Sequence, residues 1–212
     1  VIPSGSFANY IEGLSLKPLK ETSSTLDLGT VLQIDLNGQS IFAKPDIAFE
    51  DSKSFQDAKW IELIDEAVYR DQLSVAGKVS TLNLPGIDSL ANASTSGTSK
   101  ASLYTRVVGL EKKELTTTEL RNAKLRQGIS SELNETPGIF VVRKVLRAKK
   151  LQYVYRNESS VLTEAEIAGW GSGEFSADGS SSGRVLLESK IIAVQPAYVF
   201  GGSSVTNEDA NL

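Results

Sequence analysis

The 212-residue sequence contains no cysteine, no histidine and no methionine. Without cysteine the chain can form no disulfide, so nothing in it points to an oxidising compartment. Without histidine and cysteine it lacks the ligands of the common zinc sites, the usual general base and the thiol nucleophile. The sequence therefore predicts a non-enzymatic protein with no metal and no cofactor, and only chemistry based on carboxylates stays open to it.

The sequence also lacks a long apolar run. None reaches the ~18 residues of a transmembrane helix, and no secretory signal peptide is visible. Hydrophobic residues make up 40% and charged residues 23% of the chain, which is ordinary for a globular domain with a core. We therefore expect one domain over residues 1–200, a polar and flexible tail over 201–212, and a soluble, cytoplasmic starting state.

The net charge of −4 hides an uneven distribution. Residues 1–100 carry 8 basic and 13 acidic side chains, residues 101–156 carry 12 and 5, and residues 157–212 carry 2 and 8. The middle of the chain is therefore basic although the whole chain is acidic. Such a segment can meet an anionic surface.

The densest run of β-branched and aromatic residues is Gly138–Arg156, which carries six basic side chains. It predicts a long central strand, because Pro137 precedes it and a turn-like segment comes after it. Five of its cations are candidates to contact anionic lipid headgroups, each worth about 1 kcal/mol near such a surface. They are Arg143, Lys144, Arg147, Lys149 and Lys150. The simpler interpretation is one solvated strand face, and nucleic acid is disfavoured because no aromatic stacking platform accompanies the cluster.

Shorter patterns predict the elements of the first half. Helical spacing of apolar residues favours a helix over 6–14, and alternation around Asn37-Gly38 favours a hairpin over Leu28–Ala43. An apolar stripe predicts a helix over Phe55–Leu73, with a strand as the alternative for part of it. Three carboxylates there are interpreted as a solvated helix face rather than as an acid–base pair: Glu62, Asp65 and Glu66.

The second half reads mainly as strands. A β pattern over Ser74–Leu84 stops at Pro85-Gly86, and a strand is predicted over Ser102–Leu115. The capping-box spacing of Thr116 and Glu119 predicts a helix over 117–133. A last strand is predicted over Arg184–Val194, where Gln195-Pro196 breaks it.

Two stretches consist almost entirely of small residues, Ile87–Ala101 and Ala168–Gly183. Singly, each is typical of a flexible surface loop. Together they have a further property, because each lies between two β segments and could be the middle of a long hairpin. A membrane β-barrel needs only alternating, weakly apolar strands of about 9–11 residues with every backbone group paired. Trp170 and Phe175 would suit the membrane interface.

The order of these features resembles the pore-forming domain of the gasdermins. The series runs from Gly77-Lys-Val and Leu84-Pro-Gly86 through Ser102-Leu-Tyr104 and the helix ending Leu-Arg-Gln127. It continues with the core strand Phe140-Val-Val-x-x-Val-Leu146 and the near-terminal Ala197-Tyr-Val-Phe200. The ordered series covers roughly residues 75–200, and no single motif in it is diagnostic.

This resemblance implies an α+β fold, a twisted and mainly antiparallel sheet with surrounding helices. It implies two regions that extend into transmembrane hairpins on oligomerisation, about Leu84–Tyr104 and Thr163–Leu187. The first hairpin would present Ile87, Leu90, Ala91, Ala93, Ala101 and Leu103 to lipid. The second would present Ile167, Ala168, Trp170, Phe175, Ala177 and Val185.

The resemblance further implies partners and regulation. The partners would be membrane lipids, further copies in a large homo-oligomeric ring, and an activating protease that removes a C-terminal inhibitory segment. The length is similar to that of the short bacterial members, which act at the inner membrane in programmed cell death and antiphage defence. Those members commonly carry an acylated N-terminal cysteine, which is missing here, and residues 201–212 are very hydrophilic for an inhibitory helix. The alternative function is a non-enzymatic, β-rich structural or interaction subunit.

Overall fold

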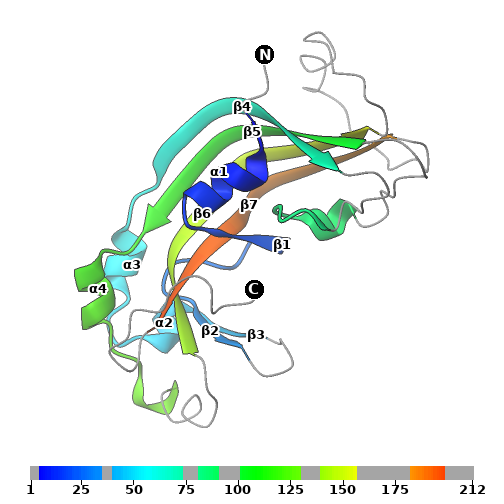
Figure 1. Cartoon of the computed structure of the whole chain (residues 1–212). Helices are drawn as coiled ribbons and strands as arrows, with labels where there is room; N and C mark the ends of the chain where they lie inside the picture. The colour runs from blue at the N-terminus through cyan, green and yellow to red at the C-terminus, as the bar shows by residue number, and fades with distance from the viewer. Residues whose placement is uncertain are drawn as a thin grey trace.

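The computed structural model describes residues 5–34, 40–73, 81–90, 101–129, 139–156 and 182–198. These residues form one antiparallel sheet with short helices around it, so the expected α+β class is confirmed. The elements in chain order are α1 (Phe7–Gly13), β1 (Lys17–Ser23), β2 (Val31–Ile34), β3 (Ser40–Ala43), α2 (Pro45–Ala48), α3 (Lys53–Asp57), β4 (Ile61–Leu73), η2 (Ile87–Leu90), β5 (Ala101–Glu114), α4 (Thr117–Asn122), β6 (Ile139–Arg156) and β7 (Ser182–Tyr198). Figure 1 shows the long strands arching together, with α1 lying across one face of the sheet. We call this face the α1 face.

Strand β6 is the centre of the sheet, as its composition predicted. It pairs with β7 along one side, from Phe140↔Tyr198 to Arg156↔Ser182. On its other side it pairs first with β2 and then, from Lys144 onward, with β5. Strand β1 extends the sheet beyond β7, β3 extends it beyond β2, and β4 extends it beyond β5. The four long strands therefore lie side by side in the order β4, β5, β6, β7 (Figure 1).

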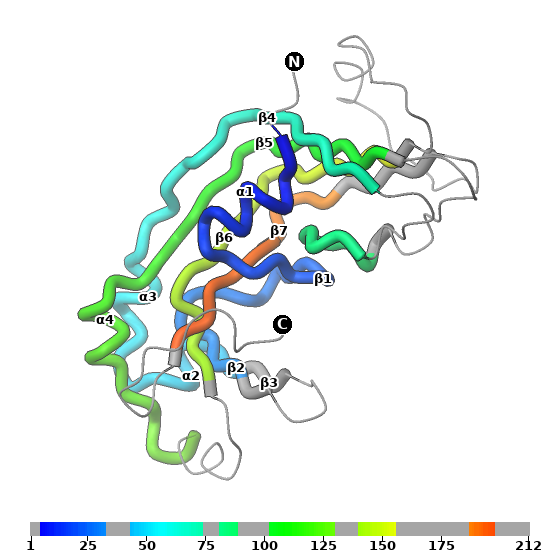
Figure 2. The backbone as a smooth tube through the Cα atoms, viewed as in Figure 1, coloured from blue at the N-terminus to red at the C-terminus, as the bar shows by residue number. Residues whose placement is uncertain are grey.

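A crease crosses three of these strands and bends the sheet. By the register of their neighbours, Gly109 of β5 lies opposite Lys149 of β6, which lies opposite Ser189 of β7. Gly109 has a φ of 61° and Ser189 a φ of 47°, both in the left-handed region. Across this line the side chains of β6 that enter the core change from even-numbered to odd-numbered positions. The strands can therefore curve around one core, and Figure 2 shows their curved course.

Two large clusters of apolar side chains hold these elements together, and a third, small one lies on the face opposite α1. On the α1 face, Phe7 and Ile11 of α1 pack against the long strands, and the Phe7 ring lies 5.1 Å from the ring of Tyr69. The second cluster surrounds the first residues of β6 and joins β2 to α2 and α3. In it the rings of Phe49 and Phe55 meet edge to face at 5.0 Å.

The helix predicted over Phe55–Leu73 is wrong for most of its length, and the strand alternative is right. Helix α3 ends at Asp57, and the chain then runs as β4, paired with β5 from end to end. The apolar residues imitate helical spacing because they enter both faces of the sheet. Val68 packs on one face and Tyr69 on the other, and both are buried. A strand covered on two sides loses its alternating pattern.

The helix predicted over 117–133 begins correctly, but it is interrupted at residues 123–126 and resumes at residues 127–129. Thr116 and Glu119 form the expected capping box, in which the Glu119 N–H donates to Thr116 Oγ1 at 3.1 Å and the Thr116 N–H donates to Glu119 Oε2 at 2.7 Å. Helix α4 nevertheless has only six residues. The chain then turns toward α2, where Leu125 forms an antiparallel bridge with Phe49.

Two strand predictions change at their ends. The strand predicted over Arg184–Val194 continues through Pro196. Proline is tolerated there because β1 pairs with β7 no further than Val194, so the missing N–H of proline costs no hydrogen bond to β1. The β pattern over Ser74–Leu84 is wrong for residues 81–84, none of which belongs to a strand, and residues 74–80 lie outside the described residues.

The remaining local predictions are confirmed where the structure describes them. Ser6 caps α1 by accepting a hydrogen bond from the Asn9 N–H at 3.2 Å. Strands β2 and β3 form the antiparallel pair expected over Leu28–Ala43, and β5 matches the strand expected over Ser102–Leu115. Several predictions fall outside the described residues: the Asn37-Gly38 turn, residues 130–133 of the predicted helix, most of Ala168–Gly183, and the tail 201–212.

Candidate functional site

The four long strands end together at one edge of the sheet. Strand β4 ends at Leu73, opposite Ala101 at the start of β5. Strand β6 ends at Arg156, opposite Ser182 at the start of β7, and Arg156 also pairs with Ser102 of β5. The pairs β4–β5 and β6–β7 are therefore two adjacent hairpin stems, whose open ends adjoin (Figure 1). Each stem leads into one of the two small-residue stretches.

Two segments cover the α1 face of these stems. One is α1, and the other is the turn at residues 81–90, whose Leu84 and Ile87 are each 1% exposed and pack in the same cluster as α1. The Tyr153 hydroxyl of β6 donates a hydrogen bond to the Pro85 carbonyl oxygen at 2.5 Å. Burial raises the pKa of Tyr153 well above its ordinary value, so this hydroxyl keeps its proton and acts as a donor.

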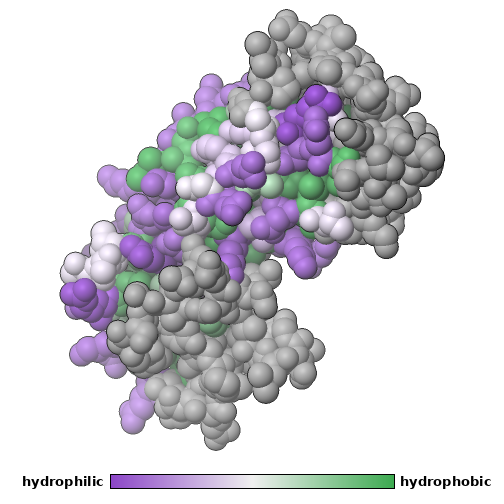
Figure 3. Space-filling view, viewed as in Figure 1, coloured by the Kyte–Doolittle hydropathy of each residue, from purple (hydrophilic) through white to green (hydrophobic). Residues whose placement is uncertain are grey.

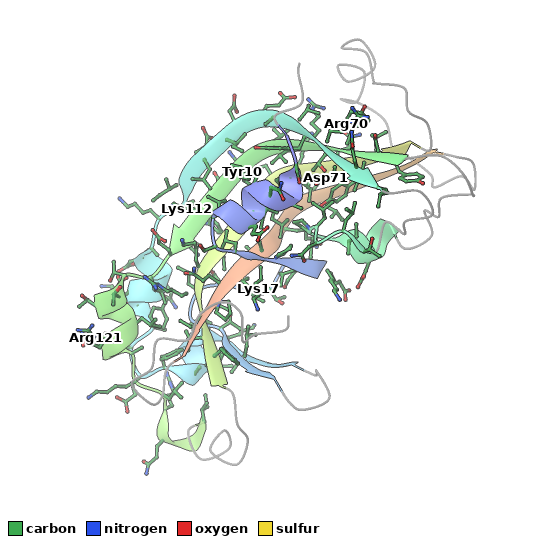
Figure 4. The ribbon with its side chains drawn as sticks, in the orientation of Figure 1. Tyr10, Lys17, Arg70, Asp71, Lys112 and Arg121 are labelled. Carbon is green, nitrogen blue, oxygen red and sulfur yellow. The ribbon has the colours of Figure 1, made fainter. Side chains whose placement is uncertain are left out.

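A buried carboxylate attaches α1 to β4. Asp71 is 4% exposed, and its two oxygens accept hydrogen bonds from the Ser6 hydroxyl and, at 3.1 Å, from the Phe7 N–H. Figure 4 shows Asp71 beside the start of α1, while Arg70 leaves β4 on the other side. Arg70 there donates to Ser102 Oγ at 3.0 and 3.1 Å. The α1 face thus carries a buried acid at its edge, and the opposite face carries cations.

The carboxylates that the sequence singled out lie on a strand and stay in solvent. Glu62, Asp65 and Glu66 are all exposed on β4. Glu66 forms an ion pair with Arg106 of β5 at 2.7 Å, across the strand pair. Among the described residues no group of three or more acidic side chains could hold a metal ion. Their expected role as a solvated surface is confirmed, although on a strand rather than a helix.

Three of the five predicted headgroup contacts on β6 already have ion-pair partners within the sheet. Lys144 pairs with Glu114 at 3.2 Å, while Arg147 and Lys149 pair with Glu111 at 2.6 and 3.5 Å. The other two predicted headgroup contacts also lie on this strand, with Arg143 donating to Thr117 Oγ1 at 3.4 Å and Lys150 exposed. The positive charge that this strand offers to an anionic surface is therefore smaller than the sequence alone indicates.

The same pairs set the ionisation of two glutamates. A hydrogen bond from Arg147 lowers the pKa of Glu111, and burial opposes this only in part. Burial raises the pKa of Glu114, but hydrogen bonds and charge from Lys144 and Lys112 outweigh it, so that its pKa is lowered as well. Both carboxylates therefore stay charged at neutral pH. Arg147 additionally stacks on Trp60, with its guanidinium carbon 4.0 Å from the ring centre.

The predicted membrane-contacting residues separate into three groups. Ile87 and Leu103 are buried on the α1 face, at 1% and 0% exposure. Leu90, Ala101 and Val185 belong by their backbones to η2, β5 and β7. The others fall outside the described residues: Ala91, Ala93, Ile167, Ala168, Trp170, Phe175 and Ala177. Their exposure to lipid stays a prediction.

Sequence reasoning missed the residues that hold the cover in place. In the sequence, Tyr153 is only one residue of a predicted strand, and Pro85-Gly86 only marks where a β pattern stops. No spacing in the sequence connects positions 68 residues apart. Figure 3 shows hydrophilic and apolar residues interspersed over the described part of the face seen in Figure 1.

Comparison with known proteins gives a likeness of structure and none of sequence. No protein-family model matches the chain, and no curated protein matches it. Among solved structures, the chain is similar to a bacterial gasdermin from Bradyrhizobium tropiciagri, with 15% sequence identity and a TM-score of 0.45. The match covers 93% of this chain and 88% of that one. A likeness of this size says nothing about activity. Within the described residues, no helix has the length and apolar content needed to cross a membrane.

Proposed function

We propose that this chain forms membrane pores. The β4–β5 and β6–β7 stems would lengthen into two hairpins that enter the bilayer, and many copies would assemble side by side into a ring. Support comes from continuing the observed pairing of each stem into the chain beyond it.

The lengths of both connecting segments suit hairpins that cross a membrane. If residues beyond the pair Leu73↔Ala101 continued to pair one by one, the two arms would meet at Ile87, the residue midway between Leu73 and Ala101. Continued in the same way beyond Arg156↔Ser182, the arms of β6 and β7 would meet at Gly169. Once a turn is allowed for, each arm adds about 11 residues, and a β-strand crosses a bilayer in about 9–11 residues.

The distribution of charge in these arms is the observation that carries the proposal. Beyond the crease, the residues of β4, β5 and β6 that pack on the α1 face are odd-numbered. In-register arms would therefore continue the α1 face with odd-numbered residues. All eight charged residues of the two segments have even numbers and would lie on the opposite face: Lys78, Asp88, Lys100, Glu158, Glu164, Glu166, Glu174 and Asp178.

This separation is what a membrane hairpin requires. One face would be uncharged and could meet hydrocarbon, while the other would face a water-filled interior. The backbone at the outer edges of each hairpin would still need partners, which only neighbouring copies can supply in lipid. Ring assembly results from that need, and no catalytic residue takes part, so the protein would act without being an enzyme.

The register also refines which residues would contact lipid. Most of the predicted residues are odd-numbered and would lie on the uncharged face. Three are even-numbered and would lie on the charged face: Leu90, Ala168 and Trp170. We therefore propose that these three residues line the interior or the tip rather than meeting lipid.

The regulation we propose rests on the sequence resemblance to gasdermins. A C-terminal segment would inhibit the chain until a protease removes it, and the released chain would move from the cytoplasm to the inner membrane. Lysis of the cell would then serve programmed cell death, and antiphage defence if the source is bacterial. The basic residues of β6, Lys150 first among them, would contact anionic headgroups.

The test is release of a dye from anionic-lipid vesicles by the purified chain, before and after limited proteolysis. The sharpest pair of variants is Ala177→Asp and its neighbour Ser176→Asp, which place the same charge on opposite faces of one arm. Ala177→Asp would lower the rate of dye release by about tenfold or more, because a carboxylate facing hydrocarbon is unfavourable in every copy, although it costs less than the ~2–4 kcal/mol of a lysine or arginine there. Ser176→Asp would release dye at nearly the wild-type rate.

Two results would overturn the proposal. Equal effects of the two substitutions would mean that the arms do not continue the stem register. No dye release by correctly folded wild-type protein, with or without proteolysis, would favour a β-rich structural or interaction subunit instead.

A further inference from the structure

We infer that residues 84–88 form a latch, in which the hydrogen bond from the Tyr153 hydroxyl to the Pro85 carbonyl holds the β4–β5 hairpin in its short form. This inference rests on the proposed function, since a latch has a role only if the hairpin lengthens. It concerns the control of that step, and its residues are described throughout.

Two hydrogen bonds attach the latch to different strands. The Pro85 carbonyl accepts from Tyr153 of β6 at 2.5 Å. The next residue, Gly86, donates its N–H to the Leu19 carbonyl of β1 at 2.7 Å. Consecutive residues are thus attached to strands on either side of β7. The segment is fixed in position although it belongs to no strand itself.

The latch fits its place closely. Gly86 has a φ of 65°, and a Cβ built there would lie 2.5 Å from Leu187 Cδ1 and 3.2 Å from Thr22 Cγ2. Only glycine combines this backbone conformation with so little room. Leu187 belongs to β7, so the latch of the first hairpin stem rests directly on the second stem.

The latched position and the long hairpin exclude each other. In the continued register of β4 and β5, Ile87 would be the tip of the first hairpin, about a dozen residues beyond the stem. In the present structure Ile87 is 1% exposed in the cluster on the α1 face, and η2, which it begins, lies against β1 and β7. Lengthening therefore requires that both hydrogen bonds break and that residues 84–88 leave the α1 face. The latch covers the face that would meet lipid.

The α1 face, which α1 and residues 81–90 cover, contains buried hydroxyl groups without hydrogen-bond partners in the part of the chain that the structure describes. Thr105 Oγ1 and the Tyr155 hydroxyl are buried, and neither has a hydrogen-bond partner among the described residues. Both lie on the α1 face beside Tyr153: Thr105 is its partner across the β5–β6 pair, and Tyr155 is two residues further along β6. Tyr153 differs in having a partner, and that partner is in the latch. Opening would break the hydrogen bond of the Tyr153 hydroxyl while giving water access to the other two hydroxyls, so the Tyr153 bond is the side-chain hydrogen bond that favours the closed state.

The experiment compares Tyr153→Phe with Tyr155→Phe. The two variants remove the same atom from the same strand face, but only the first removes a hydrogen bond. Amide hydrogen exchange at Gly86 reports latch opening without any membrane. We expect exchange at Gly86 to be about tenfold faster in Tyr153→Phe, the effect of one lost hydrogen bond, and unchanged in Tyr155→Phe. Dye release from anionic vesicles should start correspondingly earlier only in Tyr153→Phe.

The two measurements separate failure of the latch from failure of the pore. Unchanged exchange at Gly86 in Tyr153→Phe would overturn the latch, whatever the vesicles do. Faster exchange without earlier dye release, in a protein whose wild type does release dye, would overturn its control of lengthening. If no form of the protein releases dye, the proposed pore function fails, while exchange still decides whether residues 84–88 are held by Tyr153.

Discussion

At the scale of single residues, the crease depends on positions that tolerate a left-handed backbone. Gly109 adopts this conformation without steric strain because it has no Cβ. The side chain of Lys149 occupies the space where a Cβ would lie. A Cβ at Gly109 would lie 2.5 Å from Lys149 Cδ and 3.0 Å from its Cβ. The flexible end of lysine can move aside, whereas its Cβ is fixed by the strand.

Gly109→Ala should therefore destabilise the fold by about 1–3 kcal/mol, through backbone strain and this contact. The measurement is the urea midpoint of unfolding. Gly128→Ala is the matched control, because a Cβ there meets nothing within 4 Å and its φ is not positive. Equal midpoints for the two variants would show that the crease does not require glycine.

A second prediction at this scale concerns Glu111, whose pKa is lowered in the folded state from its ordinary value of 4.5 by the hydrogen bond from Arg147. A lowered pKa means that the charged form stabilises the fold. The contribution is complete above pH 4.5 and is lost as the pH falls through the lower folded pKa. Glu111→Gln should cost about 1–2 kcal/mol at pH 7, and the difference from wild type should shrink below pH 4.5. A difference that stays constant in urea unfolding from pH 7 to pH 3 would contradict this account.

At the scale of elements, the sequence predicts best where one local rule acts alone. The capping box of Thr116 and Glu119 and the density of β-branched residues in β6 both gave correct elements. The helix predicted over Phe55–Leu73 failed because β4 has apolar residues on both faces, and only pairing with β5 distinguishes this from a helical stripe. Propensity is a weak guide where tertiary pairing decides.

The strand register adds what the sequence could not show about the small-residue stretches. Composition located two candidate hairpins but could not assign their faces, since a slip of one residue exchanges the faces. The pairing Leu73↔Ala101 sets the register of the first hairpin. Continued into the proposed hairpin, this register would place Ala93 on the uncharged face and Asn92 on the charged one.

Ala93→Asp should therefore reduce dye release by about tenfold or more, while Asn92→Asp should leave it close to wild type. Both variants place an aspartate at adjacent positions of one arm, and Asn92→Asp changes little besides charge. Vesicle leakage at matched protein concentration is the measurement. Because the hairpin of β6 and β7 is untouched, loss of activity in both variants would show that the face assignment of the first hairpin is wrong.

At the scale of the whole molecule, the stems and their cover form one closed arrangement. Residues 84–88 are attached by hydrogen bonds to β1 and β6, while α1 is attached to β4 through Asp71. None of these contacts joins residues close in sequence, so no sequence pattern could have predicted them. The candidate hairpins are therefore recognisable from composition. The contacts proposed to keep the first hairpin short can be identified only from the three-dimensional structure.

The absence of cysteine from the chain allows a direct test of this closed arrangement. In Thr22→Cys/Gly86→Cys the two new thiols would be the only ones in the protein. A Cβ at Gly86 would lie 3.2 Å from the γ-methyl of Thr22, which is within reach of a disulfide. The strain of a cysteine at this φ is present in the oxidised and the reduced protein alike, so their comparison isolates the link. The oxidised protein should release no dye, and a reductant should restore release, because a latch fixed to β1 cannot become a hairpin tip. If the oxidised protein released dye as fast as its reduced form, residues 84–88 would not move during pore formation, and neither the latch nor the first hairpin could be as assigned.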